Sequence, residues 1–200
     1  MKLLLIASIA SFFLLTTAHA AGDVEAGKSK SAMCAACHGP DGNSPAPTFP
    51  KLAGQHADYL AKQLADYKSG ERENATMNGM AAALSEQDMA DLAAFYAAQK
   101  VIVGKAAEDQ VAAGEAVYRA GNTATGVSAC AACHGPTGSG NPMAKFPSLS
   151  GQHADYTVLQ LKSFRAGERV NDAGSMMRGV AKKMTDAEIE AVAQYIQGLH

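Results

Sequence analysis

Apolar positions recur every three or four residues along much of this chain, and that spacing marks one face of an α-helix. The pattern is strongest in two stripes, one at the end of each half, which are predicted to pack in a core. Ser85 and Thr185 precede them and are followed by acidic residues, so each begins a helix as its N-cap. The stripes are Met89, Leu92, Phe95 and Tyr96 in the first half and Ile189, Val192, Tyr195 and Ile196 in the second.

Two further helices are predicted in each half. One leads up to a cysteine pair, and the other is amphipathic and ends at a glycine, a common helix stop. The first of these contains Gly27 or Gly114, which is either a tolerated helical glycine or a close crossing with the last helix, at Phe95 or Tyr195. The bounds are about Val24 to the cysteine pair and His56–Gly70 in the first half, and about Gln110 to the cysteine pair and His153–Gly167 in the second.

The two halves repeat one pattern, because the same landmarks return in the same order. The longest shared stretch, Phe-Pro-x-Leu-x-Gly-Gln-His-Ala-Asp-Tyr, lies at 49–59 and again at 146–156. The second copy carries an insertion around 121–126. We therefore predict two tandem domains, 21–103 and 104–200. Their linker, 100–106, is short and lacks a Gly/Ser run, so we expect the domains to pack together.

Composition favours helices. Alanine is abundant, aromatic residues make up 6% and tryptophan is absent, so the predicted fold is all-α with about three main helices per domain. The formal net charge of −2 excludes nucleic-acid binding through a basic patch. The charge is divided unevenly, with about −3 on the first domain and about zero on the second.

The first twenty residues read as a secretory signal peptide. Lys2 supplies a positive start, residues 3–15 are an almost unbroken apolar run, and Ala18-His19-Ala20 is a small-residue cleavage site. The run is shorter than the roughly twenty residues that a transmembrane helix needs. We expect an exported mature chain that begins at Ala21 and is soluble or at most peripheral to a membrane.

All four cysteines fall in two identical motifs, Cys-Ala-Ala-Cys-His-Gly-Pro. Cys-x-x-Cys-His is the arrangement that attaches a c-type haem, since two thiols at i and i+3 share one helix face and the next histidine binds the iron. A thioredoxin-like disulfide lacks the expected strand-helix-strand context, and a zinc site usually gathers its ligands within a few tens of residues. We therefore predict two covalently bound haem c groups. Their protein partners are Cys34, Cys37 and His38, and Cys130, Cys133 and His134.

The second axial ligand of each iron is predicted from the repeat. Met77 and Met177 are favoured because only these two methionines share a place in both copies, in an expected loop before the last helix. His56 and His153 also repeat and make bis-histidine ligation the rival, although at the start of a helix they are expected to face solvent or a cap. The other methionines weighed are Met80, Met89, Met143, Met176 and Met184.

Pro50 and Pro147 follow the haem motifs in the repeat. Their carbonyls are candidates to accept from the second ring nitrogen of the ligand histidine and so to orient it. A simple turn proline is the alternative reading.

Taken together, these motifs resemble a class I cytochrome c domain, and two such domains in one exported chain resemble the cytochrome c4 family over 21–200. The resemblance implies a periplasmic dihaem electron carrier, not an enzyme, often membrane-associated, with His/Met ligation in both domains. It implies redox partners: a cytochrome bc1-type complex or small periplasmic donor, and a membrane-bound terminal oxidase as acceptor. The alternatives are the cytochrome subunit of a flavocytochrome dehydrogenase and a dihaem peroxidase, which needs an accessible iron.

Overall fold

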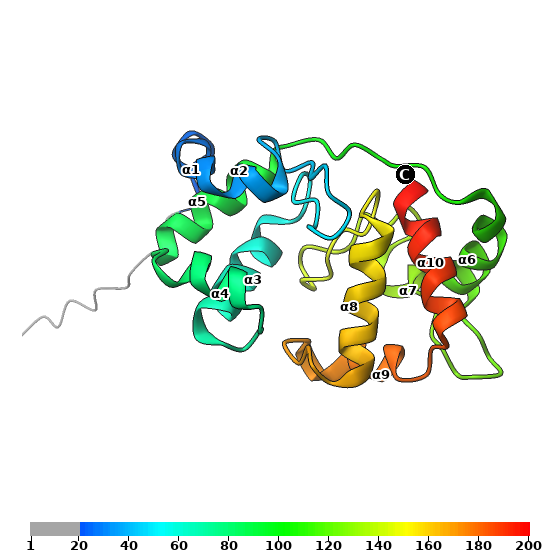
Figure 1. The fold of residues 1–200 in the computed structure, drawn as a ribbon. Coiled ribbons are helices and arrows are strands. Elements are labelled where there is room, and N and C mark those ends of the chain that lie inside the picture. The colour runs from blue at the N-terminus through cyan, green and yellow to red at the C-terminus, as the bar shows by residue number, and fades with distance from the viewer. Residues whose placement is uncertain (1–20) are drawn as a thin grey trace, which may run out of the picture.

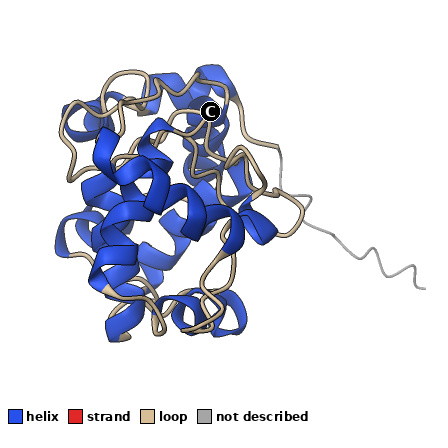
Figure 2. Cartoon of the chain, turned by 90° about the vertical axis from the view of Figure 1, so that its right-hand side faces the viewer, coloured by secondary structure: helices blue, strands red, loops and turns tan. Residues whose placement is uncertain are grey.

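The computed structural model describes residues 21–200, and the predicted signal peptide, 1–20, lies outside the described residues. The described chain forms two helical lobes that lie side by side (Figure 1). Its regular elements are helices, apart from two isolated bridges in the second lobe (Figure 2). The all-α prediction is confirmed.

The helices divide between the lobes in chain order. Those of the first lobe are α1 (Val24–Lys30), α2 (Ala32–His38), α3 (Ala57–Ser69), α4 (Ala75–Ala82) and α5 (Glu86–Ala97). Those of the second are α6 (Glu108–Ala120), α7 (Ala131–His134), α8 (Ala154–Ala166), the short 3-10 helix η1 (Ala173–Ser175), α9 (Met176–Ala181) and α10 (Asp186–Gly198).

The predicted helix ends of the second and third helices are confirmed. Ser85 and Thr185 each accept from the backbone N–H three residues on, and the acidic residue there accepts in return, which makes a capping box. At the C-terminal ends of α3 and α8, Gly70 and Gly167 adopt φ of 84° and 75°. That left-handed conformation costs glycine little, so it ends both helices.

Two expectations about the helices are wrong. The first predicted helix is broken at Ser31 in the first lobe and by the 121–126 insertion in the second, where Asn122 and Val127 form an isolated bridge. The methionine segments, expected to be loops, are the short helices α4 and α9. In α4, the Asn74 side chain caps the helix by accepting from the Met77 N–H at 3.0 Å.

Gly27 and Gly114 allow the first and last helices of each lobe to touch. A Cβ on Gly27 would lie 2.0 Å from the Asp91 carbonyl oxygen and 2.8 Å from Phe95 Cβ. A Cβ on Gly114 would lie 2.2 Å from the Ala191 carbonyl oxygen and 2.7 Å from Tyr195 Cβ. The close-crossing hypothesis is confirmed.

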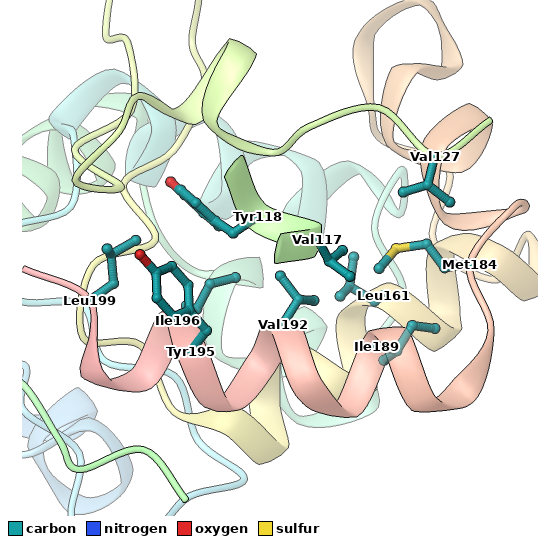
Figure 3. Close-up of a cluster of buried hydrophobic side chains, with 10 residues drawn as sticks. All are labelled: Val117, Tyr118, Val127, Leu161, Met184, Ile189, Val192, Tyr195, Ile196 and Leu199. Carbon is teal, nitrogen blue, oxygen red and sulfur yellow. The ribbon is translucent and has the colours of Figure 1, made fainter. Parts of the chain in front are cut away.

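Each lobe has its own hydrophobic cluster. The cluster of the second lobe lies along α10 and packs against α6 and α8 (Figure 3). The cluster of the first lobe is smaller and comes from α3 and α5. Its buried members are Leu60, Leu92, Ala93, Phe95 and Tyr96. The predicted stripes are therefore core residues.

The lobes are joined by hydrogen bonds that nearly repeat under exchange of the halves. Gln55 accepts from the Ser148 N–H (2.9 Å) and donates to the Ser148 carbonyl (2.8 Å). Gln152 does the same with Lys51, at 2.9 Å for both bonds. The buried Lys51 ammonium also donates to Gly151 O (3.0 Å) and to Ile102 O in the linker. The expectation that the domains pack together is confirmed.

A polar cluster extends the contact between the lobes. It lies between α3 and α8, which are on the inner sides of the lobes (Figure 1). Arg72 donates to the Tyr156 hydroxyl at 2.9 Å, and Arg169 donates to the Tyr59 hydroxyl at 3.0 Å. Both guanidiniums are buried. Burial opposes ionisation of the Tyr156 hydroxyl, but the two arginines outweigh it and lower the pKa of Tyr156.

Candidate functional site

His38 and His134 are buried at the ends of α2 and α7. The Nδ1 atom of His38 lies 2.9 Å from the Pro50 carbonyl oxygen, and Nδ1 of His134 lies 2.9 Å from that of Pro147. A carbonyl only accepts, so Nδ1 carries the proton and Nε2 keeps a lone pair for a metal. Burial lowers the pKa of both rings, which favours the neutral imidazole. The orienting role predicted for the proline carbonyls is confirmed.

The cysteine pairs lie beside these histidines in sequence, and one cysteine of each pair packs against a domain core. Cys34 packs against the core of the first lobe and Cys130 against that of the second, whereas Cys133 is exposed. Burial raises the pKa of Cys34, and it raises the pKa of Cys130 to about 11. Burial therefore favours the neutral thiol at both positions.

The alternatives to haem gain no support from this arrangement. All four cysteines are free of disulfide bonds. Between residues 21 and 200, no three His, Cys, Asp or Glu residues gather in a way that would hold a metal ion. Each lobe instead offers two thiols and one neutral imidazole with its Nε2 available, and this donor set fits a covalently attached haem.

The methionines differ in their surroundings. Met177 is half-buried on α9 and packs against the core cluster that also contacts Cys130, while its neighbour Met176 is 45% exposed. Met77 and Met80 are half-buried on α4. Met143 is 93% exposed, and Met89 and Met184 are buried in the cores, as expected of residues that fill space. The ligand role of Met77 and Met177 stays a prediction.

His56 and His153 are half-buried and cap no helix, which corrects the expectation for them. Each stands directly before α3 or α8 and makes no side-chain cap. Nε2 of His56 donates to the Ser139 carbonyl at 2.8 Å, and Nε2 of His153 donates to the Ser44 carbonyl at 2.9 Å, so both bonds cross between the lobes. The pair proposed as rival iron ligands is engaged in the domain contact.

Sequence reasoning missed the polar residues that join the lobes. Gln55 and Gln152 lie inside the repeated stretch, and Arg72 and Arg169 each follow a helix-ending glycine by two residues. Their recurrence at equivalent places was the available signal. Polar residues are usually solvated, and a repeat alone does not tell a contact surface from an exposed one.

Comparisons with known proteins agree with this geometry. The sequence model of the family described as Cytochrome c matches residues 24–98 and 111–200. Cytochrome c4 of Pseudomonas aeruginosa is 50% identical over 201 residues, covering all of both chains. The crystal structure of reduced recombinant cytochrome c4 from Pseudomonas stutzeri is 51% identical with a TM-score of 0.88, over 90% of this chain and 100% of that one. A thiosulfate dehydrogenase electron acceptor of Stutzerimonas stutzeri is 39% identical over 200 residues, covering 95% of this chain and 92% of its own.

Proposed function

The chain belongs to the cytochrome c4 family of electron-transfer proteins and carries two covalently attached haem c groups, and from that premise we propose that it works in the periplasm and passes electrons towards a membrane-bound terminal oxidase. Each haem, once bound, exchanges one electron through its iron. The protein's own part is to hold, orient and shield the two groups.

One observation carries this proposal: the same histidine geometry occurs twice, in lobes that are hydrogen-bonded to each other. In each lobe the imidazole is buried, neutral and fixed by one proline carbonyl. The reciprocal bonds of Gln55 and Gln152 fix the separation of the two sites. A fixed separation suits a carrier that takes up two electrons and moves them between sites.

We propose His38 and Met77 as the axial ligands of the first iron and His134 and Met177 as those of the second. Supporting the second pair, Met177 packs against the core cluster that Cys130 also contacts, while Met176 is exposed. A soft thioether favours ferrous iron and raises the reduction potential compared with a second imidazole. An iron with both axial positions filled has no open site for peroxide, which favours a carrier over a peroxidase.

The proposed domains are 21–103 and 104–200, preceded by a signal peptide at 1–20 that directs export. Within residues 21–200, no helix is both long and apolar enough to cross a bilayer. Any membrane association of the mature chain is proposed to be peripheral. A cytochrome bc1-type complex or a small periplasmic protein is the proposed donor.

The electron acceptor is testable with the purified holoprotein. We expect the reduced protein to be reoxidised by membranes of the producing bacterium, with oxygen consumed in proportion and the reaction blocked by cyanide. Reoxidation that cyanide does not block argues against a terminal oxidase as acceptor. So does the absence of any reoxidation by these membranes.

A second candidate is the electron acceptor of a dehydrogenase. It is favoured by the 39% identity to a protein named as the electron acceptor of thiosulfate dehydrogenase. The cytochrome subunit of a flavocytochrome dehydrogenase belongs to the same class of role. Purification from the native host at low salt distinguishes it, because this role predicts that a dehydrogenase copurifies at a fixed ratio and reduces both haems with its substrate.

A further inference from the structure

The segment 169–172, between α8 and η1, is fastened to the first lobe by Asn171. Three residues of α3 bind this one asparagine through both its side chain and its backbone. Gln63 Oε1 (2.9 Å) and Asp66 Oδ2 accept from the side-chain amide, and Lys62 Nζ donates to the carbonyl (3.0 Å). The first lobe therefore holds the chain only a few residues before Met177.

Asp172 carries this link to the helix of Met177. Its carboxylate is buried, with 5% of the side chain exposed, and it accepts from the Arg178 backbone N–H at 3.0 Å and from Arg178 Nε at 2.7 Å. Arg178 directly follows Met177. Two charge-assisted bonds from one buried carboxylate restrain both the backbone and the side chain of that neighbour.

The methionine helix of the first lobe is held differently. Asn74 caps α4 by accepting from the Met77 N–H, and Asn78 donates to the carbonyls of Tyr67 and Arg72. These four residues belong to the same lobe as Met77. In contrast, α9 has no side-chain cap at its N-cap residue Ser175, whose φ is 57°. Asp172 therefore supplies the support that α9 lacks at its own N-terminus.

We propose that Asp172 positions Met177 against the second iron, and that Asn171 makes this bond depend on the first lobe. The inference rests on the proposed ligand pair of His134 and Met177. A thioether is a weak iron ligand, so its bond persists where the surrounding chain holds the sulfur in place. The link runs by hydrogen bonds from α3 to Asn171, along the chain to Asp172, and by two further bonds to Arg178, the residue that follows Met177.

Imidazole competition on the ferric holoprotein tests the role of Asp172. Added imidazole displaces a bound methionine, and the loss of the sulfur-to-iron charge-transfer band reports it. The assay is run in the Met77→His background, in which Met177 alone gives the band. We expect Asp172→Ala to lower the imidazole concentration for half displacement about tenfold, as second-sphere substitutions do for other metal ligands. Asp172→Asn keeps an acceptor for the Arg178 N–H, so its shift is smaller.

The matched control is Glu190→Ala, which removes an exposed ion pair with Lys162 on the same lobe. We expect it to leave the competition curve unchanged. An unchanged curve in Asp172→Ala, or an equal shift in Glu190→Ala, overturns the positioning role. Asn171→Ala should shift the curve in the same direction. Arg169 still binds Tyr59 and Gln63 in this variant, so no shift there overturns the role of Asn171. A parent protein with no charge-transfer band refutes the ligand pair itself, which is a separate outcome.

Discussion

At the scale of single residues, one hydrogen bond sets which nitrogen of each histidine is available to iron. His38 and His134 are held by proline carbonyls through Nδ1, whereas His56 and His153 use Nε2 to hold the opposite lobe. Four histidines in two repeated pairs thus serve two purposes. The partner of each ring distinguishes the pairs, and the residue type alone does not.

The ligand assignment predicts opposite results for two neighbouring substitutions. Met177→His should keep the second haem six-coordinate and lower its potential, because imidazole favours ferric iron more than thioether does. Met176→Leu should leave both potentials and the charge-transfer band intact, since Met176 is exposed. Potentiometric titration with ferric absorption spectra checks both. If the band stays at full strength in the Met177 variant and falls by about half in the Met176 variant, the ligand is one residue earlier.

A carboxylate outside the haem motifs, that of Asp91, predicts a dependence of stability on pH. The Asp23 backbone N–H, Lys30 and Gln87 lower the pKa of Asp91 to about 2. The ordinary value in an unfolded chain is about 3.9. The stabilisation is therefore complete above about pH 4 and is lost as the pH falls through about 2.

Asp91→Asn removes this contribution, so parent and variant should differ in unfolding free energy at pH 6 and converge between pH 4 and 2. Denaturant melts across that range measure the difference, in which losses common to both proteins cancel. A gap that stays constant down to pH 2 contradicts the assignment.

At the scale of elements, the sequence predicts helices where local signals decide them. Ser85 and Thr185 stand before an acidic residue and an apolar stripe, and both form capping boxes. The helix α4 was missed although its cap, Asn74, directly precedes it, whereas the support of α9 comes from Asp172, outside the helix and its N-cap residue. The contact surface between the lobes was missed because its partners, such as Gln55 and Ser148, lie far apart in the chain.

The helix crossing at Gly114 predicts a large cost for one methyl group. In Gly114→Ala the new Cβ meets the backbone oxygen of Ala191, which cannot move without shifting α10. Overpacking of this kind costs about 1–3 kcal/mol, and the backbone contact places this case at the upper end. Gly179→Ala is the control because nothing lies within 4 Å of its Cβ position, so a helical alanine there should be neutral or stabilising. Equal unfolding free energies for both variants would refute the close crossing.

At the scale of the whole molecule, the two lobes contact each other much as two copies of one subunit would. Gln55 and Gln152 exchange equivalent bonds, as do Arg72 with Tyr156 and Arg169 with Tyr59. Glutamines that bind backbone N–H and C=O groups tolerate different side chains at the partner position, Ser148 in one half and Lys51 in the other. A duplicated domain can thus keep its interface while its other surfaces diverge.

This interface predicts that the lobes unfold together and can be uncoupled. Gln55→Ala with Gln152→Ala removes four hydrogen bonds between the lobes and deprives the backbone groups of Ser148 and Lys51 of these partners. Each unsatisfied group costs about 1–3 kcal/mol. We expect one calorimetric transition in the parent holoprotein and two in the double variant. Gln99→Ala is the control, since it removes one bond within the first lobe, to Phe95 O. A single transition in the double variant, with the midpoint of the Gln99 variant, would mean that the glutamine bonds do not couple the lobes.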